Sequence, residues 1–480
     1  MCFRLALSSV LIFAGATVGC GASPAGPSVV LVVIDTLRAD HLGAYGYERR
    51  TSPAIDARAR QGAVFERAFS TAPWTLPSVG SMLTGQLPTR HGAGIVVHDV
   101  SEFPDREQLQ ELVRRGELLF YALETSLPTL AEVFQEGGYA TAAIVNNSFL
   151  APGFGVARGF DHYDFAEQPP LERPANIAVD LAIDWLGEHR EQRVGQPFFL
   201  MLHLIDPHMP YAAPEPFRGK FVDPYAADLP AVLTASEMYE LRDRLRDDRD
   251  DPALSLAIQL AIYDEEIAFA DHELERFFDA LDASGLGEDT IVAITSDHGE
   301  EFFDHGKFEH GHSVYNELVR IPLIVWGPGV VSGRYEAPVS LVDLMPTVLD
   351  AGGLSTPEGL AGESLWSLLN GGARPVESLP VPFDRLLFIE RTLYGDEKKS
   401  VISWPWKALI NVPDDYQELY QLERDPGELV NERSAEEDRY FTLLSALQAT
   451  MLAADQQGRS NAVTLDEKTL KGLRNLGYIR

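Results

Sequence analysis

Acidic residues end three apolar runs that the sequence predicts as buried strands. Asp35 and Asp206 follow two of these runs directly, and Asp297 comes one residue after the third. In an open α/β sheet, reactive groups gather at the carboxyl ends of the strands. We therefore expect one crevice to hold all three carboxylates.

A histidine-rich loop follows Asp297. Four of the twelve histidines of the chain lie between positions 298 and 312. A solvated loop can collect one or two histidines by chance, but carboxylates and imidazoles at this density are the ligand set of a divalent cation. We assign Asp297 and His298 as metal ligands, whereas His310 and His312 fit either the metal or the substrate. Lys307, in the same loop, is assigned to substrate binding.

A hydroxyl group stands where a helix is expected to begin. Pro77 follows Thr75 by two positions, and Gly85 is expected to end the helix. A hydroxyl at this place faces the positive end of the helix dipole, where anions bind readily. The same position suits an N-cap residue, and from these residues alone we interpret Thr75 as the cap.

Two further histidines flank the carboxylate of Asp206. His203 and His208 fall in the stretch from His203 to Tyr211, at the end of a predicted strand. A lone buried histidine is usually structural. Two imidazoles beside a carboxylate favour a role in proton transfer.

The elements that position these groups alternate along the chain. Helical patterns separate the apolar strand runs, which indicates an α/β fold with a mostly parallel sheet covered on both faces. We predict strands at 29–34, 140–145, 198–205 and 290–295, helices at 174–189 and 256–281, and a surface insertion at 101–126. Short strands and aromatic residues after about residue 379 predict a smaller antiparallel subdomain.

The beginning of the chain has the pattern of an export signal. Arg4 precedes an apolar run too short to span a membrane, and Cys20 closes it in a sequence resembling the bacterial lipobox. We predict a lipoprotein of the bacterial periplasm or cell envelope, anchored at Cys20; a plain signal peptide with a chance cysteine is the alternative. The predicted parts are a signal peptide (1–20), a tether (21–28), a catalytic domain (29–378) and a C-terminal subdomain (379–480).

The net charge of the chain argues against nucleic acid as a partner. Lysine and arginine total 39 against 72 acidic residues, and the formal net charge is −33. Such a charge opposes broad attraction to nucleic acid or to anionic lipid. We therefore expect no nucleic-acid partner, and membrane contact only through the lipid anchor.

The motifs together resemble the sulfatase family of the alkaline phosphatase superfamily, over nearly the whole mature chain. The stretches that carry the resemblance are Ile34-Asp35-Thr36-Leu37-Arg38-Ala39-Asp40, Thr75-Leu76-Pro77-Ser78 with Leu83-Thr84-Gly85, Ser296-Asp297-His298-Gly299-Glu300, Tyr315-Asn316-Glu317 with Arg320-Ile321-Pro322-Leu323-Ile324, Val342-Asp343-Leu344 with Pro346-Thr347, and Glu418-Leu419-Tyr420 with Asp425-Pro426 and Asn431. The resemblance implies the three-layer alkaline-phosphatase-like fold. It also raises Thr75 to a candidate nucleophile and metal ligand beside Asp35, Asp297 and His298.

Departures from the family pattern bear on the reaction. Sulfatases that hydrolyse sulfate esters convert a Cys or Ser at the position of Thr75 to formylglycine, and threonine cannot give that aldehyde. Val79 replaces the signature arginine, and Asn146 stands near the place of a frequent Gly-Lys-Trp-His motif. The threonine resembles that of phosphodiesterase, phosphonate hydrolase and phosphoglycerol or phosphoethanolamine transferase relatives, so we favour a phosphate-type ester.

The expected mechanism uses Thr75 as a metal-activated nucleophile. Asn146 and His208 are candidates to meet the charge on the transferring group. The residue that protonates the leaving oxygen stays open among His203, His208, His310 and His312. Mostly oxygen ligands with one imidazole suit Ca²⁺, Mn²⁺, Mg²⁺ or Zn²⁺ without selecting among them.

Other functions remain open from the sequence. The chain fits a sulfuric ester hydrolase, a phospho-group transferase, or a catalytically silent binder of an anionic glycan or envelope polymer. A structural envelope lipoprotein would lack the metal that the aspartates and histidines predict. The expected partner is an anionic phosphate or sulfate ester, on a glycan or a lipid headgroup.

Overall fold

The computed structural model of the chain describes residues 26–95, 120–165, 173–221, 256–371, 385–412, 417–455, 462–463 and 466–476. Three sequence predictions lie outside these residues: the signal peptide, the lipid anchor at Cys20, and residues 101–119 of the surface insertion.

A central eight-stranded sheet carries the four predicted strands at its middle. Its order is β14-β2-β13-β9-β1-β8-β6-β7, and β9 through β7 are parallel, whereas β13 is antiparallel to both of its neighbours. The strands are β1 (Ser28–Ile34), β2 (Ala63–Phe65), β6 (Ala140–Val145), β7 (His162–Phe165), β8 (Phe198–Leu204), β9 (Thr290–Ser296), β13 (Leu323–Trp326) and β14 (Gly333–Tyr335). The predicted α/β fold with a mostly parallel sheet is confirmed.

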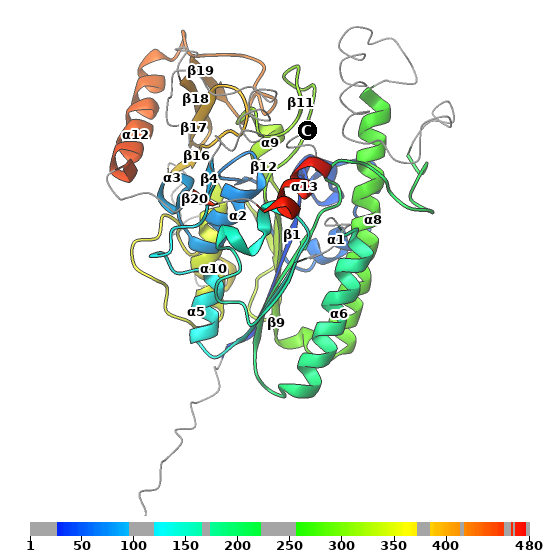
Figure 1. Cartoon of the computed structure of the whole chain (residues 1–480). Helices are drawn as coiled ribbons and strands as arrows, with labels where there is room; N and C mark the ends of the chain where they lie inside the picture. Colours follow the sequence, from blue (N-terminus) through cyan, green and yellow to red (C-terminus); the bar gives the residue numbers. More distant parts are fainter. Residues whose placement is uncertain are drawn as a thin grey trace, which may run out of the picture.

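Helices cover both faces of this sheet, because alternate residues of each buried strand point to opposite sides. In β1, Val29, Leu31 and Val33 join one apolar core, and the residues between them join another. The first core includes α2 (Thr75–Thr84), α5 (Leu130–Glu136) and α10 (Leu344–Ala351); the second includes α1 (Pro53–Ala59), α6 (Ala175–Gln192) and α8 (Leu256–Ala283). Figure 1 shows α6 and α8 side by side on one side of the sheet.

A separate antiparallel sheet forms the predicted C-terminal subdomain. Its four strands are β16 (Leu386–Ile389), β17 (Glu397–Ser403), β18 (Trp406–Val412) and β19 (Gln417–Gln421), in sequence order. Helix α12 (Glu437–Asp455) lies beside this sheet (Figure 1). Its residues Tyr440, Leu443 and Leu447 form an apolar cluster with one face of the sheet. The other face packs against Val314 and Leu318 of the main domain.

The last described residues return to the main domain. Strand β20 (Ala462–Val463) pairs with β5 (Phe120–Tyr121), and α13 (Glu467–Asn475) places Leu473 in the core shared with α2. Within the described part of the chain, no helix combines the length and the apolar character that spanning a bilayer requires.

Candidate active site

Three adjacent strands bring two carboxylates and an imidazole together. Val33 of β1 pairs with His203 of β8 and with Thr295 of β9. Because side chains alternate along a strand, His203, Asp35 and Asp297 all face the layer that contains α2. A ligand atom from each of the three lies within 4.8 Å of the others, and all three residues are fully buried.

Thr75 and His298 complete this cluster. Thr75 is the first residue of α2, and its Oγ1 lies 3.4 Å from Nε2 of His298. That nitrogen is 3.5 Å from Oδ1 of Asp35 and 3.6 Å from Oδ2 of Asp297. The expectation that Thr75 is only a helix cap is wrong: Trp74 takes the N-cap position, and the threonine hydroxyl points to the acidic cluster.

Several atoms of the cluster lack a hydrogen-bond partner among the described residues. They are Oδ1 of Asp35, Oδ2 of Asp297 and both ring nitrogens of His203. Leaving buried polar atoms unpaired costs free energy, and two adjacent buried carboxylates also repel each other. A divalent cation bound among them would remove both penalties, so the residues present fit the expected metal.

Burial sets the charge states within the cluster. Burial and repulsion from Asp297 raise the pKa of Asp35 well above its ordinary value. Burial also lowers the pKa of His298, and it lowers that of His203 to about 4. Both imidazoles are therefore neutral near pH 7, which is the form that coordinates a metal.

Asn147 is a site residue that the sequence analysis missed. Its Nδ2 donates to Oδ2 of Asp35 at 2.7 Å and to Oγ1 of Thr75 at 3.2 Å. Its Oδ1 accepts from the backbone of Phe149 at 2.9 Å, which caps the short helix that follows β6 and fixes the amide. An asparagine just before a turn is an N-cap signal in the sequence, and that signal could have pointed to Asn147.

The structure places the predicted substrate residue Asn146 differently. Its Nδ2 donates to the carbonyl of His203, and its Oδ1 accepts from Nε of Arg173. These bonds tie the end of β6 to β8, while the neighbouring Asn147 faces the threonine.

His208 and His310 lie beside the cluster. The ring centres of His298 and His310 are 4.4 Å apart, and those of His310 and His208 are 5.1 Å apart. Nδ1 of His310 is 2.9 Å from a carboxylate oxygen of Glu300, whereas burial lowers the pKa of His208 to about 4. The bond to Glu300 holds the ring of His310 beside His298, and the lowered pKa of His208 makes that residue a poor proton donor near pH 7, so His310 is the better candidate of the two.

His312 and Lys307 lie with the C-terminal sheet. Nε2 of His312 is 2.7 Å from Glu301, and its carbonyl accepts from Nζ of Lys398 in β17 at 2.9 Å. Burial and the nearby charge of Lys307 lower the pKa of Lys398 to about 8. Lys307 itself is exposed.

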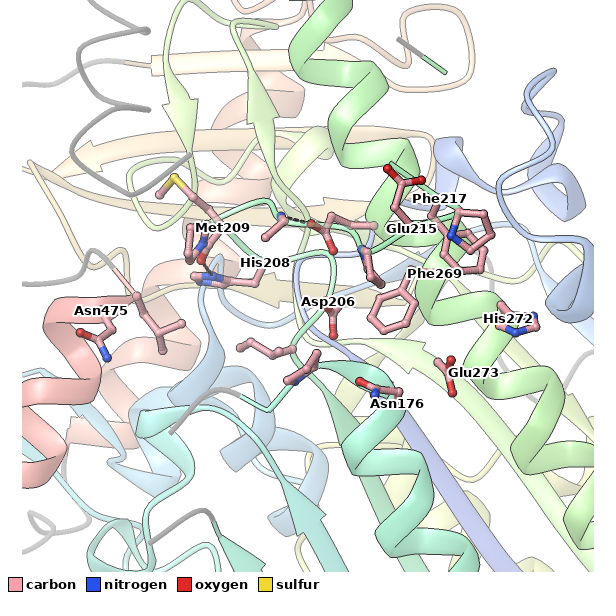
Figure 2. A pocket seen from close by; sticks show the side chains of 18 residues that line it. Asn176, Asp206, His208, Met209, Glu215, Phe217, Phe269, His272, Glu273 and Asn475 are labelled. Atoms are coloured by element: carbon pink, nitrogen blue, oxygen red, sulfur yellow. Dashed lines mark hydrogen bonds between the residues drawn. The ribbon is translucent and has the colours of Figure 1, made fainter. Parts of the chain in front are cut away.

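The prediction that Asp206 shares the crevice is wrong. The chain turns after β8, and Oδ2 of Asp206 accepts from the backbone of Ala175 at the start of α6 at 2.7 Å. Asp206 instead lines a cavity of about 720 Å³ together with Glu266, Phe217, Phe269 and His208 (Figure 2). None of the described residues that line this cavity is a lysine or an arginine. His208 also lines the cavity, and its ring packs against His310 beside the acidic cluster.

Comparison with known proteins agrees with this fold. The Sulfatase family model matches residues 27–354. An arylsulfatase from Clostridium perfringens is 26% identical over 497 residues, covering 95% of this chain and all of the relative. The chain therefore belongs to the sulfatase family of the alkaline phosphatase superfamily and is a hydrolase of that family.

Solved structures have the same fold. A 2-O GAG sulfatase superposes with a TM-score of 0.67 at 20% identity, covering 92% of this chain and 96% of the other. The phosphonate monoester hydrolase of Agrobacterium radiobacter superposes with a TM-score of 0.64 at 21% identity, covering 90% and 96%. Members with different esters as substrates thus share this architecture.

Proposed function

We propose that this protein is a metal-dependent hydrolase of anionic esters that uses Thr75 as its nucleophile, with a phosphodiester or phosphonate-type ester favoured. The observation that carries the proposal is the position of the Thr75 hydroxyl. It lies at the start of α2, within reach of His298 and Asn147, and next to two carboxylates with unpaired oxygens.

A bound divalent cation would favour the threonine alkoxide and offset negative charge on the ester. Asp35, Asp297, His298 and Thr75 are the residues that would hold it. Asn147 orients the hydroxyl of Thr75 and the carboxylate of Asp35 at the same time.

The reaction then proceeds in two displacements. Thr75 loses its proton to water, Oγ1 attacks phosphorus, and the P–O bond to the leaving alcohol breaks as the bond to Thr75 forms. His310, held by Glu300, donates a proton to the leaving oxygen. Water then attacks phosphorus and gives a proton to His310, and the bond to Thr75 breaks. The threonine oxygen leaves as the alkoxide and takes back from solvent the proton that it lost in the first step.

The choice of a phosphate-type ester rests on the nucleophile. Threonine cannot become formylglycine, and the phosphonate monoester hydrolase with the same fold supports phosphorus chemistry. Sulfate ester hydrolysis is the second candidate, because the relatives include proteins named arylsulfatase and choline-sulfatase. A transferase would differ only in replacing the second water by an acceptor alcohol.

The cavity beside His208 is proposed to receive the alcohol part of the substrate. Asp206, Glu266 and Glu273 line it, and no described lining residue is a lysine or arginine. An alcohol that carries further sulfate or phosphate groups would be repelled there, whereas a neutral or cationic alcohol would be accepted.

Export is proposed from the leader alone. The run before Cys20 favours secretion to the bacterial periplasm or cell envelope, with lipidation at Cys20 as the anchor. Mass spectrometry of the exported protein tests this: a chain beginning at a diacylated Cys20 supports it, and an unmodified mature N-terminus contradicts lipidation.

A side-by-side assay tests the proposed reaction. The purified protein is offered an aryl sulfate, an aryl phosphate monoester, a phosphodiester and a phosphonate ester, each with Ca²⁺, Mn²⁺, Mg²⁺ or Zn²⁺. We expect phosphodiester or phosphonate turnover that Thr75→Ala abolishes and Thr75→Ser partly retains. Faster turnover of the aryl sulfate than of every phosphorus ester by the wild-type protein would contradict the substrate assignment. Full activity of Thr75→Ala would contradict Thr75 as the nucleophile.

A further inference from the structure

The imidazole of His203 occupies a position of β8 whose neighbours on the same face are apolar. Its neighbours on the same face of the strand, Met201 and Ile205, belong to the core shared with α2. His203 is fully buried, yet neither of its ring nitrogens has a hydrogen-bond partner among the described residues. A leucine would fill this place without burying an unpaired polar group, so the imidazole needs a partner that it gains on binding.

The unpaired nitrogens lie at the acidic cluster. Nε2 of His203 is 3.6 Å from Oδ2 of Asp35, and one of its nitrogens lies within 4.8 Å of a ligand oxygen of Asp297. An isolated structural histidine would be bonded like His189, whose Nε2 is 2.9 Å from the carbonyl of Gln196. His189 thus has a partner for one of its ring nitrogens, whereas His203 has a partner for neither among the described residues.

We infer that His203 is a metal ligand and that, with His298, it makes the site select a first-row transition ion of the Zn²⁺ type over Ca²⁺. The inference deepens the proposed function and rests on it for the place of the cation. Ca²⁺ takes oxygen ligands almost alone, whereas two neutral imidazoles with carboxylates suit Zn²⁺ and its neighbours in the series.

Metal binding by the full chain tests the inference without any substrate. The protein, expressed with its own leader and purified in detergent, is stripped with a chelator and titrated with Zn²⁺ and with Ca²⁺. We expect Zn²⁺ to bind at least about a hundredfold more tightly than Ca²⁺. Equal or tighter binding of Ca²⁺ would overturn the inference, whether or not any variant folds.

Two matched variants then test whether a ring nitrogen of His203 binds the metal. His203→Leu should weaken Zn²⁺ binding at least about tenfold, and because it removes an unpaired buried group it should raise the melting temperature of the metal-free protein. His189→Leu, which removes a bonded buried histidine elsewhere, should lower that melting temperature and leave Zn²⁺ affinity unchanged. A folded His203→Leu protein with wild-type Zn²⁺ affinity would overturn the assignment.

The electronic spectrum of the Co²⁺-loaded protein gives an independent readout. Loss of a nitrogen ligand should change the visible bands of His203→Leu but not those of His189→Leu. If no ester is hydrolysed while Zn²⁺ binding still depends on His203, the proposed function fails and the ligand assignment stands.

Discussion

At the scale of single residues, Asn147 links the proposed nucleophile to a proposed metal ligand. One amide nitrogen donates to both Thr75 and Asp35, and the amide oxygen caps the following turn. The side chain therefore has a proposed positioning function at Thr75 and a structural function in the cap, and the two are separable because different atoms carry them.

Asn147→Ser separates these functions. The serine hydroxyl can still accept from the backbone of Phe149, so the cap and the melting temperature should be nearly retained. The amide donor is lost, and we expect kcat to fall about 10–1000-fold, as for other preorganised donors in active sites. Measured kcat and melting temperature check this; wild-type kcat would show that the amide does not support Thr75.

Sequence reasoning located the carboxylates but not every neighbour. Asp35 and Asp297 follow continuous apolar strands, and a strand end in a parallel sheet fixes the place of the next side chain. Asn146 and Asn147 lie beyond the end of β6, where strand alternation stops, and only the turn geometry decides which of them faces Thr75. The direction of the His203 side chain likewise depends on the register between β1 and β8.

At the scale of elements, the loop after β8 and helix α8 shape the proposed alcohol pocket. Burial and repulsion from Asp206 raise the pKa of Glu266 well above its ordinary value, and its Oε1 accepts from the backbone of Ala212 in that loop. Asp206 and Glu266 together present at least one negative charge to the cavity when a cationic group enters it.

Asp206→Asn tests the charge preference of this pocket. Burial raises the pKa of Asp206 to about 6, so Asp206 carries the charge of the pair above that pH. The substitution keeps the shape and removes the charge, so we expect kcat/KM for a substrate with a cationic leaving alcohol to fall about tenfold relative to its neutral isostere at about pH 8. Asp279→Asn, at an exposed position of α8 outside the cavity lining, is the control. An equal change in both variants would contradict a role of Asp206 in substrate choice.

The long strands were predictable because each is a mostly apolar run, rich in β-branched residues in β1 and β9 and in large apolar residues in β8. The antiparallel direction of β13 and the short strands β2 and β14 were not, since strand direction depends on the path of the connecting chain and a run of three residues carries little pattern. These three strands lie beyond β9, on the side away from β8, so missing them did not change the predicted positions of Asp35 and His203.

At the scale of the whole molecule, buried charges join the C-terminal sheet to the main domain. Nζ of Lys407 in β18 is 2.8 Å from Glu428, and both side chains are inaccessible to solvent. The ammonium also donates to Asn316, whose backbone donates to Glu428. Asn316 opens the short helix α9 (Asn316–Val319) after the histidine loop, so the junction supports that loop.

Lys407→Met should destabilise the protein by about 3–5 kcal/mol, because it leaves Glu428 charged and unpaired in the interior. Denaturant unfolding measures the loss. The double variant Lys407→Met with Glu428→Met should recover much of it, since no buried charge remains. A double variant less stable than Lys407→Met alone would contradict this explanation.

His305 adds a pH-dependent contact to the same junction. Burial opposes its protonation, but the bond from Nδ1 to Glu317 at 2.7 Å outweighs burial and raises the pKa of His305 to about 9. Because the folded pKa exceeds the unfolded value of about 6.5, the stabilisation is complete below about pH 6.5 and is lost as the pH rises through about 9.

His305→Gln should therefore lower the melting temperature at pH 6 and have progressively less effect up to pH 9.5. Thermal unfolding of both proteins across this range gives the difference between their melting temperatures. Groups that titrate equally in both proteins do not contribute to that difference. A difference that is constant with pH would show that the stacking of His305 on Tyr315, and not its charge, stabilises the junction.

The central claim, a covalent threonine ester, is tested most directly by the stereochemistry at phosphorus. A chiral phosphorothioate diester is hydrolysed by the wild-type protein in ¹⁸O-labelled water, and the configuration of the product is determined. Two in-line displacements, first by Thr75 and then by water, predict overall retention of configuration. Inversion would mean that water attacks the substrate directly, and it would contradict Thr75 as the nucleophile.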